Sequence, residues 1–369
     1  MDILSLSKNL ISFQTITGNR EQIQKCLEYI KQTLEPTGAL VDIFSFKDAS
    51  PVLFARNQNS EHFDALVLGH IDVVEGTNEM FCAKQKNGRL YARGALDMKS
   101  FAAVAINSMA YVMEKKLDLK FGLIFSTDEE QGSKSLEAFL KTHPNLKSDI
   151  VLDNDVGGDI TKIVVRCKNP VYVKLVAKGK AAHGSTPWEG IDANEQLLKT
   201  WQNIRKVFPH YSELSGKPKQ TWIDTLHFAK ISGGNVANII SDSAEALLDF
   251  RLTEKSTVQE LKNKLLPLME DGVAFEVVMQ SIPVVIDENH PHLLAYKNLA
   301  EHVLQKPTLF EYIGGATDSR AFYERGAVII MHSGTGDGMH AANEWVDINS
   351  VMKLADIQIQ FLRNLGQKK

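Results

Sequence analysis

The stretch Ala65–Val74, with the sequence ALVLGHIDVV, carries the pattern that best predicts the fold of this chain. Its first four residues form an apolar run, which is typical of a short buried strand. The run ends at Gly69-His70, and Asp72 follows. In an open α/β sheet, ligands bind outside the carboxyl ends of the strands, so we expect these polar residues to lie at a functional site.

Similar segments follow along the chain. Phe121–Phe125 is another apolar run and leads into Thr127-Asp128-Glu129-Glu130, and Ile150–Leu152 leads into Asp153-Asn154-Asp155. Between them, Lys99–Lys115 has the length and periodicity of a helix. Strands and helices that alternate in this way predict an α/β domain with a mixed, largely parallel sheet.

From about Val171 the pattern changes. Two helical segments, Ala193–Val207 and Val258–Glu270, are interleaved with four alternating strand segments, and α/β character returns after Pro283. A chain of 369 residues is also longer than one hydrophobic core supports. We therefore predict one domain from residues 1–169 and 282–369, into which residues 170–281 are inserted as a smaller α+β, ferredoxin-like domain.

Composition narrows the classes of partner. The formal net charge is −4 and no basic stripe is present, so neither nucleic acid nor an anionic membrane is expected as a partner. No apolar run approaches the ~18 residues of a membrane span. The cysteines Cys26, Cys82 and Cys167 are far apart and odd in number, so a disulfide framework is not expected. These features predict a cytoplasmic protein.

The dense carboxylates at the strand ends indicate a metal site. Asp97 and His340, the latter in Gly336–His340, add to the three clusters. Carboxylates gathered at one sheet edge repel one another, and cations are the simplest compensation. Two imidazoles among several carboxylates suit Zn²⁺, with Co²⁺ or Mn²⁺ as tolerated substitutes.

Each residue also has a simpler explanation. His70 could be a hydrogen-bonded core histidine, and His340 a loop histidine without a role. Glu129 and Glu130 could be the solvated start of a helix. Asp97 could cap a helix that begins near Met98. The joint pattern favours the metal site over these separate explanations.

The sequence resembles the di-zinc metallohydrolases that include acetylornithine deacetylase, succinyl-diaminopimelate desuccinylase, aminoacylase, carboxypeptidase G and several dipeptidases. The matching motifs are Gly-His-x-Asp-Val-Val at Gly69–Val74, Arg-Gly-x-x-Asp-Met-Lys at Arg93–Lys99 and Asp-Glu-Glu-x-Gly at Asp128–Gly132. The resemblance covers nearly the full length. Departures from the family pattern, such as Glu75 and Phe101, lie near the expected substrate entrance.

The resemblance implies two zinc ions per subunit. Asp97 would bridge them, with His70 and Asp155 on one ion and Glu130 and His340 on the other. Asp153 stays open as an alternative to Asp155. Two further carboxylates would have other roles: Glu129 as the general base that deprotonates the attacking water, and Asp72 as the partner that orients His70.

The inserted domain resembles the family's lid and dimerisation domain. In the motif Gly179–Ser185, His183 would reach into the partner subunit's site and stabilise the oxyanion, which implies a homodimer. Asn238 and Arg251 would bind the substrate carboxylate and carbonyl, although a surface ion pair is an alternative for Arg251. Thr317, in the loop Gly314–Asp318, would line the substrate side.

The sequence thus predicts a metal-dependent hydrolase that cleaves an amide bond next to a carboxylate in a small substrate. An N-acyl amino acid deacylase and a short-peptide peptidase both fit this description. An alternative from another class is a catalytically retired amino-acid or peptide binding scaffold of the same fold. Because all the metal ligands and Glu129 are retained, we favour the enzyme.

Overall fold

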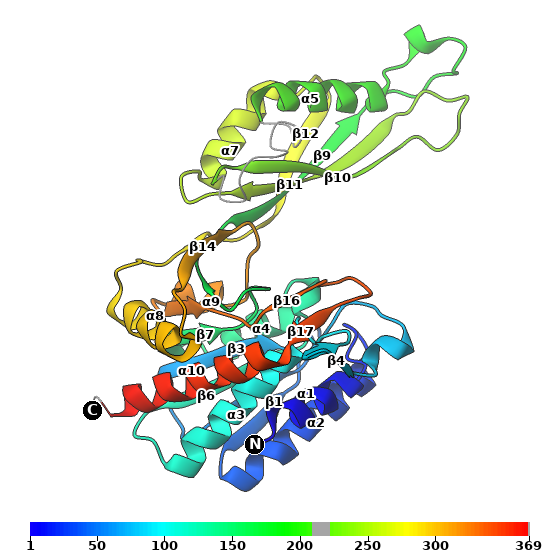
Figure 1. Cartoon of the computed structure of the whole chain (residues 1–369). Coiled ribbons are helices and arrows are strands. Elements are labelled where there is room, and N and C mark those ends of the chain that lie inside the picture. Colours follow the sequence, from blue (N-terminus) through cyan, green and yellow to red (C-terminus); the bar gives the residue numbers. More distant parts are fainter. Residues whose placement is uncertain (209–221, 368–369) are drawn as a thin grey trace. The chain divides into compact units, whose positions relative to one another are not determined.

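The computed structural model describes residues 1–208 and 222–367. It forms two compact units (Figure 1). The first unit consists of residues 1–165, 286–311 and 317–369, and the second of residues 166–285 and 312–316. Both segments of the second unit therefore interrupt the chain of the first, and residues 166–285 form the main insertion.

The central sheet of the first unit is mixed and largely parallel, as predicted. Its strands lie in the order β1 (Leu40–Phe44), β2 (Val52–Arg56), β6 (Phe121–Ser126), β3 (His62–His70), β7 (Lys147–Asp153), β15 (Val328–Met331) and β8 (Lys162–Cys167). Strand β3 is parallel to both neighbours, and β7 is parallel to β15. The carboxyl ends of β3, β6, β7 and β15 therefore meet at one edge of the sheet.

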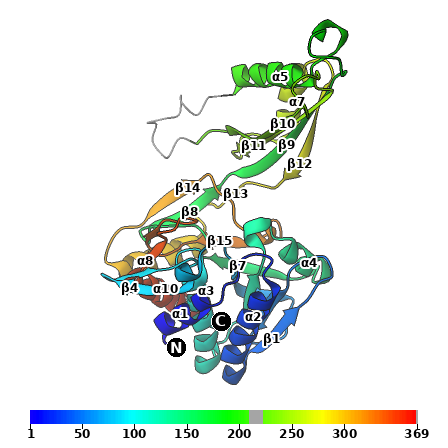
Figure 2. The ribbon, with the colours of Figure 1, turned by 90° about the vertical axis from the view of Figure 1, so that its right-hand side faces the viewer.

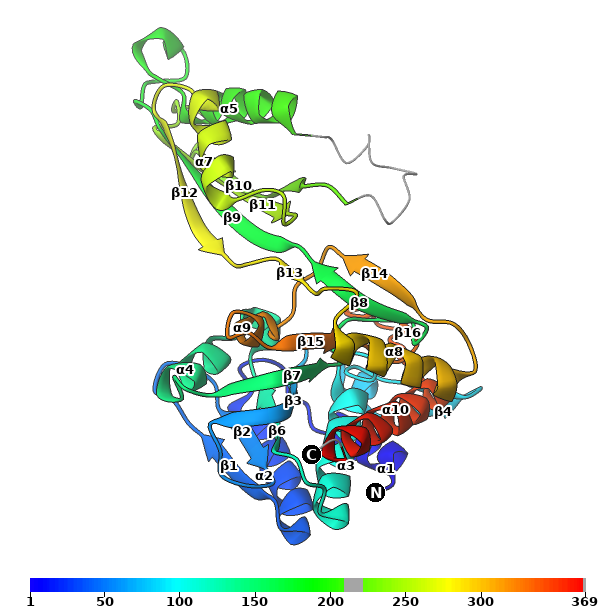
Figure 3. The same ribbon diagram turned by 90° about the vertical axis from the view of Figure 1, so that its left-hand side faces the viewer.

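Helices cover both faces of this sheet (Figure 3). The elements are α1 (Ile3–Ser12), α2 (Arg20–Leu34), α3 (Lys99–Lys115), α4 (Lys134–Thr142), α8 (Pro291–Leu304), α9 (Arg320–Tyr323) and α10 (Ile348–Gly366). Helix α3 packs against β3 and β6, and α1 and α10 pack on it in turn. Its departure from the family pattern, Phe101, is fully buried. Among the described residues, no helix is long and apolar enough to cross a membrane.

A small antiparallel sheet completes the first unit. Its strands lie in the order β16 (Gly336–Asp337), β17 (Trp345–Asp347), β5 (Arg89–Tyr91) and β4 (Lys84–Lys86). Asn87 and Gly88, with φ of 51° and 75°, form the two-residue turn between β4 and β5. Asn-Gly is the preferred pair for such a turn because both positions need a positive φ. This sheet brings the segment after β5 next to the segment before β17.

The second unit is built on a four-stranded antiparallel sheet in the order β10 (Thr225–Gly233), β11 (Ser243–Leu252), β9 (Asn169–Lys178) and β12 (Val273–Gln280). Helices α5 (Ala193–Val207) and α7 (Val258–Leu265) lie on one face (Figure 2). Along β9 the residues Val171, Val173 and Leu175 are buried in the core under these helices, and the intervening residues are less buried. This α+β arrangement agrees with the sequence pattern.

The remaining elements are short. Strands β13 (Val284–Val285) and β14 (Leu309–Ile313) pair with β8. The 3-10 helices are η1 (Glu35–Thr37), η2 (Asn78–Phe81), η3 (Glu129–Gln131), η4 (Pro187–Glu189) and η5 (Leu266–Leu268).

Candidate metal centre

The predicted polar clusters meet at the carboxyl edge of the first unit's sheet. His70 is the last residue of β3, and Glu129 and Glu130 begin η3, shortly after β6 ends at Ser126. Asp155 follows the last residue of β7, Asp153. Parallel pairing of β3 with both β6 and β7 is the reason that these residues lie together.

Asp97 lies between the two predicted histidine ligands. Its Oδ1 is 3.0 Å from Nε2 of His70, and its Oδ2 is 3.0 Å from Nε2 of His340. The helix that follows is capped at Met98 without a side-chain hydrogen bond, so the alternative of Asp97 as a helix cap is wrong. The carboxylate instead has one oxygen directed at each imidazole.

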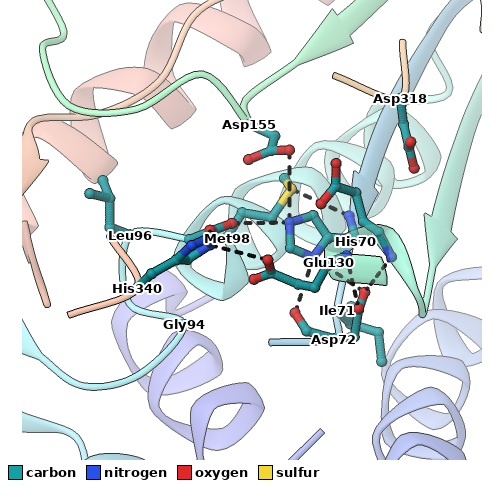
Figure 4. A network of polar contacts seen from close by, with 12 residues as sticks. His70, Ile71, Asp72, Gly94, Leu96, Met98, Glu130, Asp155, Asp318 and His340 are labelled. Carbon is teal, nitrogen blue, oxygen red and sulfur yellow. Dashed lines mark hydrogen bonds and ion pairs between the residues drawn. The ribbon is translucent and has the colours of Figure 1, made fainter. Parts of the chain in front are cut away.

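Two groups of potential metal ligands share this carboxylate. One consists of His70, Asp97 and Asp155, and the other of Asp97, Glu130 and His340, with the atoms of each group within 4.8 Å of one another. Figure 4 shows the side chains of Glu130 and His340 directed toward each other, and Nε2 of His340 is 3.1 Å from a carboxylate oxygen of Glu130. One imidazole and two carboxylates in each group form a donor set that suits Zn²⁺.

The electrostatics of the site fit divalent cations. Burial and the neighbouring charge of Asp97 raise the pKa of Glu130 to about 7. Burial likewise raises the pKa of Asp155 to about 6, and burial together with the charge of Asp155 raises the pKa of Glu129 well above its ordinary value. Without a cation these carboxylates penalise one another's ionisation, and a bound cation removes that penalty.

The two aspartates after β7 have different surroundings. A carboxylate oxygen of Asp155 is 3.8 Å from Nε2 of His70, within the first donor group. Oδ1 of Asp153 instead accepts a hydrogen bond of 2.8 Å from the backbone N–H of Asp155. The geometry therefore favours Asp155 as the donor and gives Asp153 a supporting contact.

Asp72 connects His70 to the segment that carries the two glutamates. Nδ1 of His70 is 3.0 Å from the carbonyl oxygen of Asp72 and 3.4 Å from its Oδ1. The Asp72 carboxylate also accepts hydrogen bonds from the backbone N–H groups of Glu129 and Glu130, at 3.1 and 3.3 Å. Such a partner fixes the orientation and tautomer of a ligating imidazole. Thr17, which sequence reasoning did not single out, donates to the same carboxylate at 2.8 Å.

Two other residues near the site were given no role by the sequence. Arg93 and Glu344 form a buried ion pair of 2.7 Å next to Asp97. Arg93 stands in a motif quoted above, and Glu344 follows His340 by four positions. Its position near His340 is the only feature of the sequence that draws attention to Glu344. This position does not predict that Glu344 pairs with Arg93, which lies far away along the chain.

Thr317 is buried in the first unit, where its hydroxyl is 2.5 Å from that of Ser319. The adjacent Asp318 accepts hydrogen bonds from the hydroxyls of Ser126 and Ser133. This loop is thereby fixed to the segments around β6 and η3. Figure 4 shows Asp318 alongside the donor groups.

The predicted lid residues belong to the second unit. His183 and Asn238 are both exposed and lie on adjoining segments, since the N–H of Gly184 donates to the carbonyl of Asn238 at 2.8 Å. Arg251 lies near the far end of β11. Its guanidinium binds the carboxylate of Asp249 through two hydrogen bonds of 2.9 and 3.0 Å. The structure thus brings His183 and Asn238 together and pairs Arg251 with Asp249, the ion pair that the sequence left open.

The chain is similar to known proteins in both sequence and fold. Residues 66–364 match the model of peptidase family M20/M25/M40. The chain belongs to this family. The matched segment contains every residue of the two donor groups.

Relatives of the family cover the whole chain. It is 27% identical to the succinyl-diaminopimelate desuccinylase of Pelagibacter ubique, with 98% of each chain covered. Among solved structures it is similar to the M20 metallo-carboxypeptidase Sso-CP2 of Sulfolobus solfataricus, with a TM-score of 0.80, 22% identity and complete coverage of both chains. It is also similar to YXEP of Bacillus subtilis, a dinuclear metal-binding peptidase of the M20 family, with a TM-score of 0.69, 16% identity and coverage of 100% and 98%. The protein is therefore a metallohydrolase of this family, with the family's fold.

Proposed function

We propose that this protein hydrolyses an amide bond next to a carboxylate in a small substrate, with two Zn²⁺ ions held at the carboxyl edge of the first unit's sheet. The substrate would be an N-acyl amino acid or a short peptide. The observation that carries the proposal is the position of Asp97, whose two oxygens each lie 3.0 Å from a different imidazole. A carboxylate in this position can serve two ions at once.

His70 and Asp155 would hold one ion with Asp97, and Glu130 and His340 the other. The ions supply a Lewis acid that polarises the scissile carbonyl and acidifies a water molecule. Asp72 would keep the ring of His70 in its ligating orientation through the contact at Nδ1.

Glu129 would act as the general base. It neighbours Glu130, and both backbone N–H groups are fixed by the Asp72 carboxylate. Burial raises its pKa well above the ordinary value, which suits a carboxylate that accepts a proton from water and then passes it to the leaving amine.

The proposed substrate class rests on the relatives and on the second unit. The relatives include desuccinylases and metallo-carboxypeptidases, which are named for amide substrates. His183 and Asn238, exposed on adjoining segments, would contribute oxyanion and substrate contacts from a partner subunit in a homodimer. Arg251 would bind the substrate carboxylate only by exchanging its hydrogen bonds with Asp249. Thr317 would support the substrate side of the pocket from its buried position.

The competing function is a binding scaffold that has lost catalysis. The variant Glu129→Ala separates the two, because it removes the base and none of the five residues that form the donor groups. We expect it to bind two Zn²⁺ ions like the parent and to lose nearly all turnover in a zinc-loaded screen of N-acyl amino acids and dipeptides, measured by amine release. Glu137→Ala, which changes an exposed glutamate of α4, is the matched control. If the parent protein releases no amine from any of these compounds, the scaffold is supported.

A further inference from the structure

The buried ion pair of Arg93 and Glu344 joins the two segments that carry Asp97 and His340. We propose that these are positioning residues, which set the spacing between Asp97 and His340 and thereby the affinity of the second metal site, formed by Asp97, Glu130 and His340. This inference rests on the proposed two-metal function.

Glu344 holds the loop that carries Asp97. Its Oε1 accepts hydrogen bonds from the backbone N–H groups of Leu96 and Asp97, at 2.8 and 3.1 Å. Its Oε2 accepts one from the N–H of Gly94 at 3.0 Å and one from the guanidinium of Arg93 at 2.7 Å. The side chain of Glu344 is 0% exposed, and all four of its donors belong to the single segment 93–97. A carboxylate with four donors can fix the path of this loop as no neutral side chain can.

Arg93 extends the same contact to His340. One of its terminal nitrogens donates to Glu344, and the other donates to the carbonyl oxygen of His340 at 3.1 Å. Its Nε donates to the carbonyl oxygen of Glu75 at 3.2 Å. Because the guanidinium is planar and rigid, these three acceptors are held in one fixed arrangement. Arg93 and Glu344 together therefore connect both ends of the contact between Asp97 and His340.

The small sheet explains why this pair forms. Trp345 of β17 pairs with Tyr91 of β5, and the next pair outward joins the N–H of Ala92 to the carbonyl oxygen of Glu344. Arg93 and Glu344 thus lie just beyond the end of this ladder, on two segments that are far apart in the sequence. The Asn87-Gly88 turn sets the register of β5 against β4. The pairing of β5 with β17 then positions the segment 93–97, which contains Asp97, next to Glu344.

The two metal sites depend on this pair to different degrees. In the first site, His70 ends a central strand and is 1% exposed, and Asp155 lies two residues after the end of another central strand. In the second site, the side chain of His340 is 51% exposed and its backbone has a positive φ of 63°, in the loop between β16 and β17. The sheet holds the first set of ligands, whereas His340 depends on the contact with Arg93. Loss of the pair should therefore weaken the second site more than the first, although both share Asp97.

The test measures the two zinc affinities of the metal-free protein by calorimetric titration. Glu344→Gln keeps the shape of the side chain but loses an accepting oxygen, and Arg93→Lys keeps the charge but cannot bind three acceptors. In both variants we expect the second Zn²⁺ ion to bind about 10–100-fold more weakly, in the range seen when partners of ligands are changed. The first ion, which shares Asp97 but is also held by His70 and Asp155, should lose less affinity than the second. Asp42→Asn, which breaks the exposed ion pair of Asp42 with Arg56, is the control and should change neither affinity.

A spectroscopic readout independent of turnover accompanies the titration. Co²⁺ is titrated in place of Zn²⁺, at micromolar concentrations at which the parent protein binds two equivalents. In the two variants the visible absorption of bound Co²⁺ should then saturate after one equivalent. Unchanged affinities in a folded Arg93→Lys protein, or an equal loss at both sites, would overturn the inference while leaving the two-metal function intact. If Glu344→Gln does not fold, Arg93→Lys decides the matter. A parent protein that binds fewer than two ions would overturn the proposed function itself.

Discussion

Nε2 of His340 lies 3.0 Å from Oδ2 of Asp97, although 243 positions separate the two residues in the sequence. The other oxygen of the same carboxylate lies 3.0 Å from Nε2 of His70. This arrangement places one acidic side chain between two imidazoles that come from opposite ends of the first unit's chain. It makes Asp97 the residue on which both donor groups depend.

The first prediction concerns this shared carboxylate. Asp97→Asn should abolish the binding of both zinc ions and reduce turnover by at least about a thousandfold, because a neutral amide cannot offer two anionic oxygens. His340→Ala should remove only one ion. The zinc content of the purified proteins, measured by atomic emission, distinguishes the two. An Asp97→Asn protein that retains two equivalents of zinc would contradict the bridging role.

The second prediction is that activity depends on metal. Dialysis against a chelator should abolish turnover, and Zn²⁺, Co²⁺ or Mn²⁺ should restore it, because these ions accept nitrogen and oxygen ligands. Ions that bind only the folded state should also raise the melting temperature, with a larger rise at higher ion concentration. Full turnover in protein shown to be free of metal would be incompatible with the proposed function.

The third prediction tests whether His183 acts across subunits. His183→Ala and Glu129→Ala should each be inactive alone. After the two proteins are mixed under conditions that exchange subunits, about a quarter of the parent activity should return, because half of the dimers then contain one complete site. Mixing Glu129→Ala with Asp97→Asn is the control, since both changes inactivate the site of the subunit that carries them and no mixed dimer then contains a complete site. Retention of full activity by a monomer in light scattering would rule out this arrangement.

The fourth prediction concerns stability in acid. Burial lowers the pKa of His332 to about 4, and its ring is hydrogen-bonded to Tyr296 and to the carbonyl of Ile160. Because the pKa of His332 is lower in the folded state than in the unfolded state, the neutral ring favours folding. This contribution to the free energy of unfolding is fully present above the unfolded-state pKa near 6.5 and is lost as the pH falls towards 4. The loss is on the order of 3 kcal/mol.

Urea unfolding of the parent and of His332→Gln at pH 7 and pH 4.5 measures this effect. The variant is expected to be less stable than the parent at pH 7, because it loses buried hydrogen bonds. Its stability should fall less than that of the parent between the two pH values. An equal fall in both proteins would show that His332 does not titrate in this way.

The fifth prediction concerns the packing of the second unit. A Cβ added at Gly179 would lie 2.1 Å from the carbonyl oxygen of Ile191 and 2.9 Å from the backbone nitrogen of Ala193. Backbone atoms cannot move aside as the end of a flexible side chain can, so Gly179→Ala should destabilise the second unit by about 1–3 kcal/mol. Gly314→Ala, where no atom lies within 4 Å, is the matched control. Thermal unfolding measures both variants.

Much of the fold followed from local patterns. The apolar run Ala65–Leu68 and the run Phe121–Phe125 predicted central strands, and both lie in β3 and β6. The change of pattern near Val171 predicted the α+β arrangement of the second unit, in which β9 alternates between buried and less buried residues. These features were predictable because burial on one or both faces of a strand leaves a periodic pattern in the sequence itself.

The supporting contacts were not predictable in this way. Thr17 binds the Asp72 carboxylate, and Glu344 binds the loop of Asp97 across 247 positions of sequence. Such partners are set by the register of strands and by the order of strands in a sheet, neither of which has a local signal.

The sequence by itself thus determined the class of fold, the strand-end clusters and the residues able to bind metal, because these follow from periodicity and residue chemistry. Only the tertiary structure decided that Asp97 lies between the two histidines rather than capping a helix, and which of Asp153 and Asp155 faces His70. The physical reason is that ligation depends on where side-chain oxygens point within a few ångströms. That direction is fixed by parallel strand pairing and by the buried contacts of Asp72, Arg93 and Glu344.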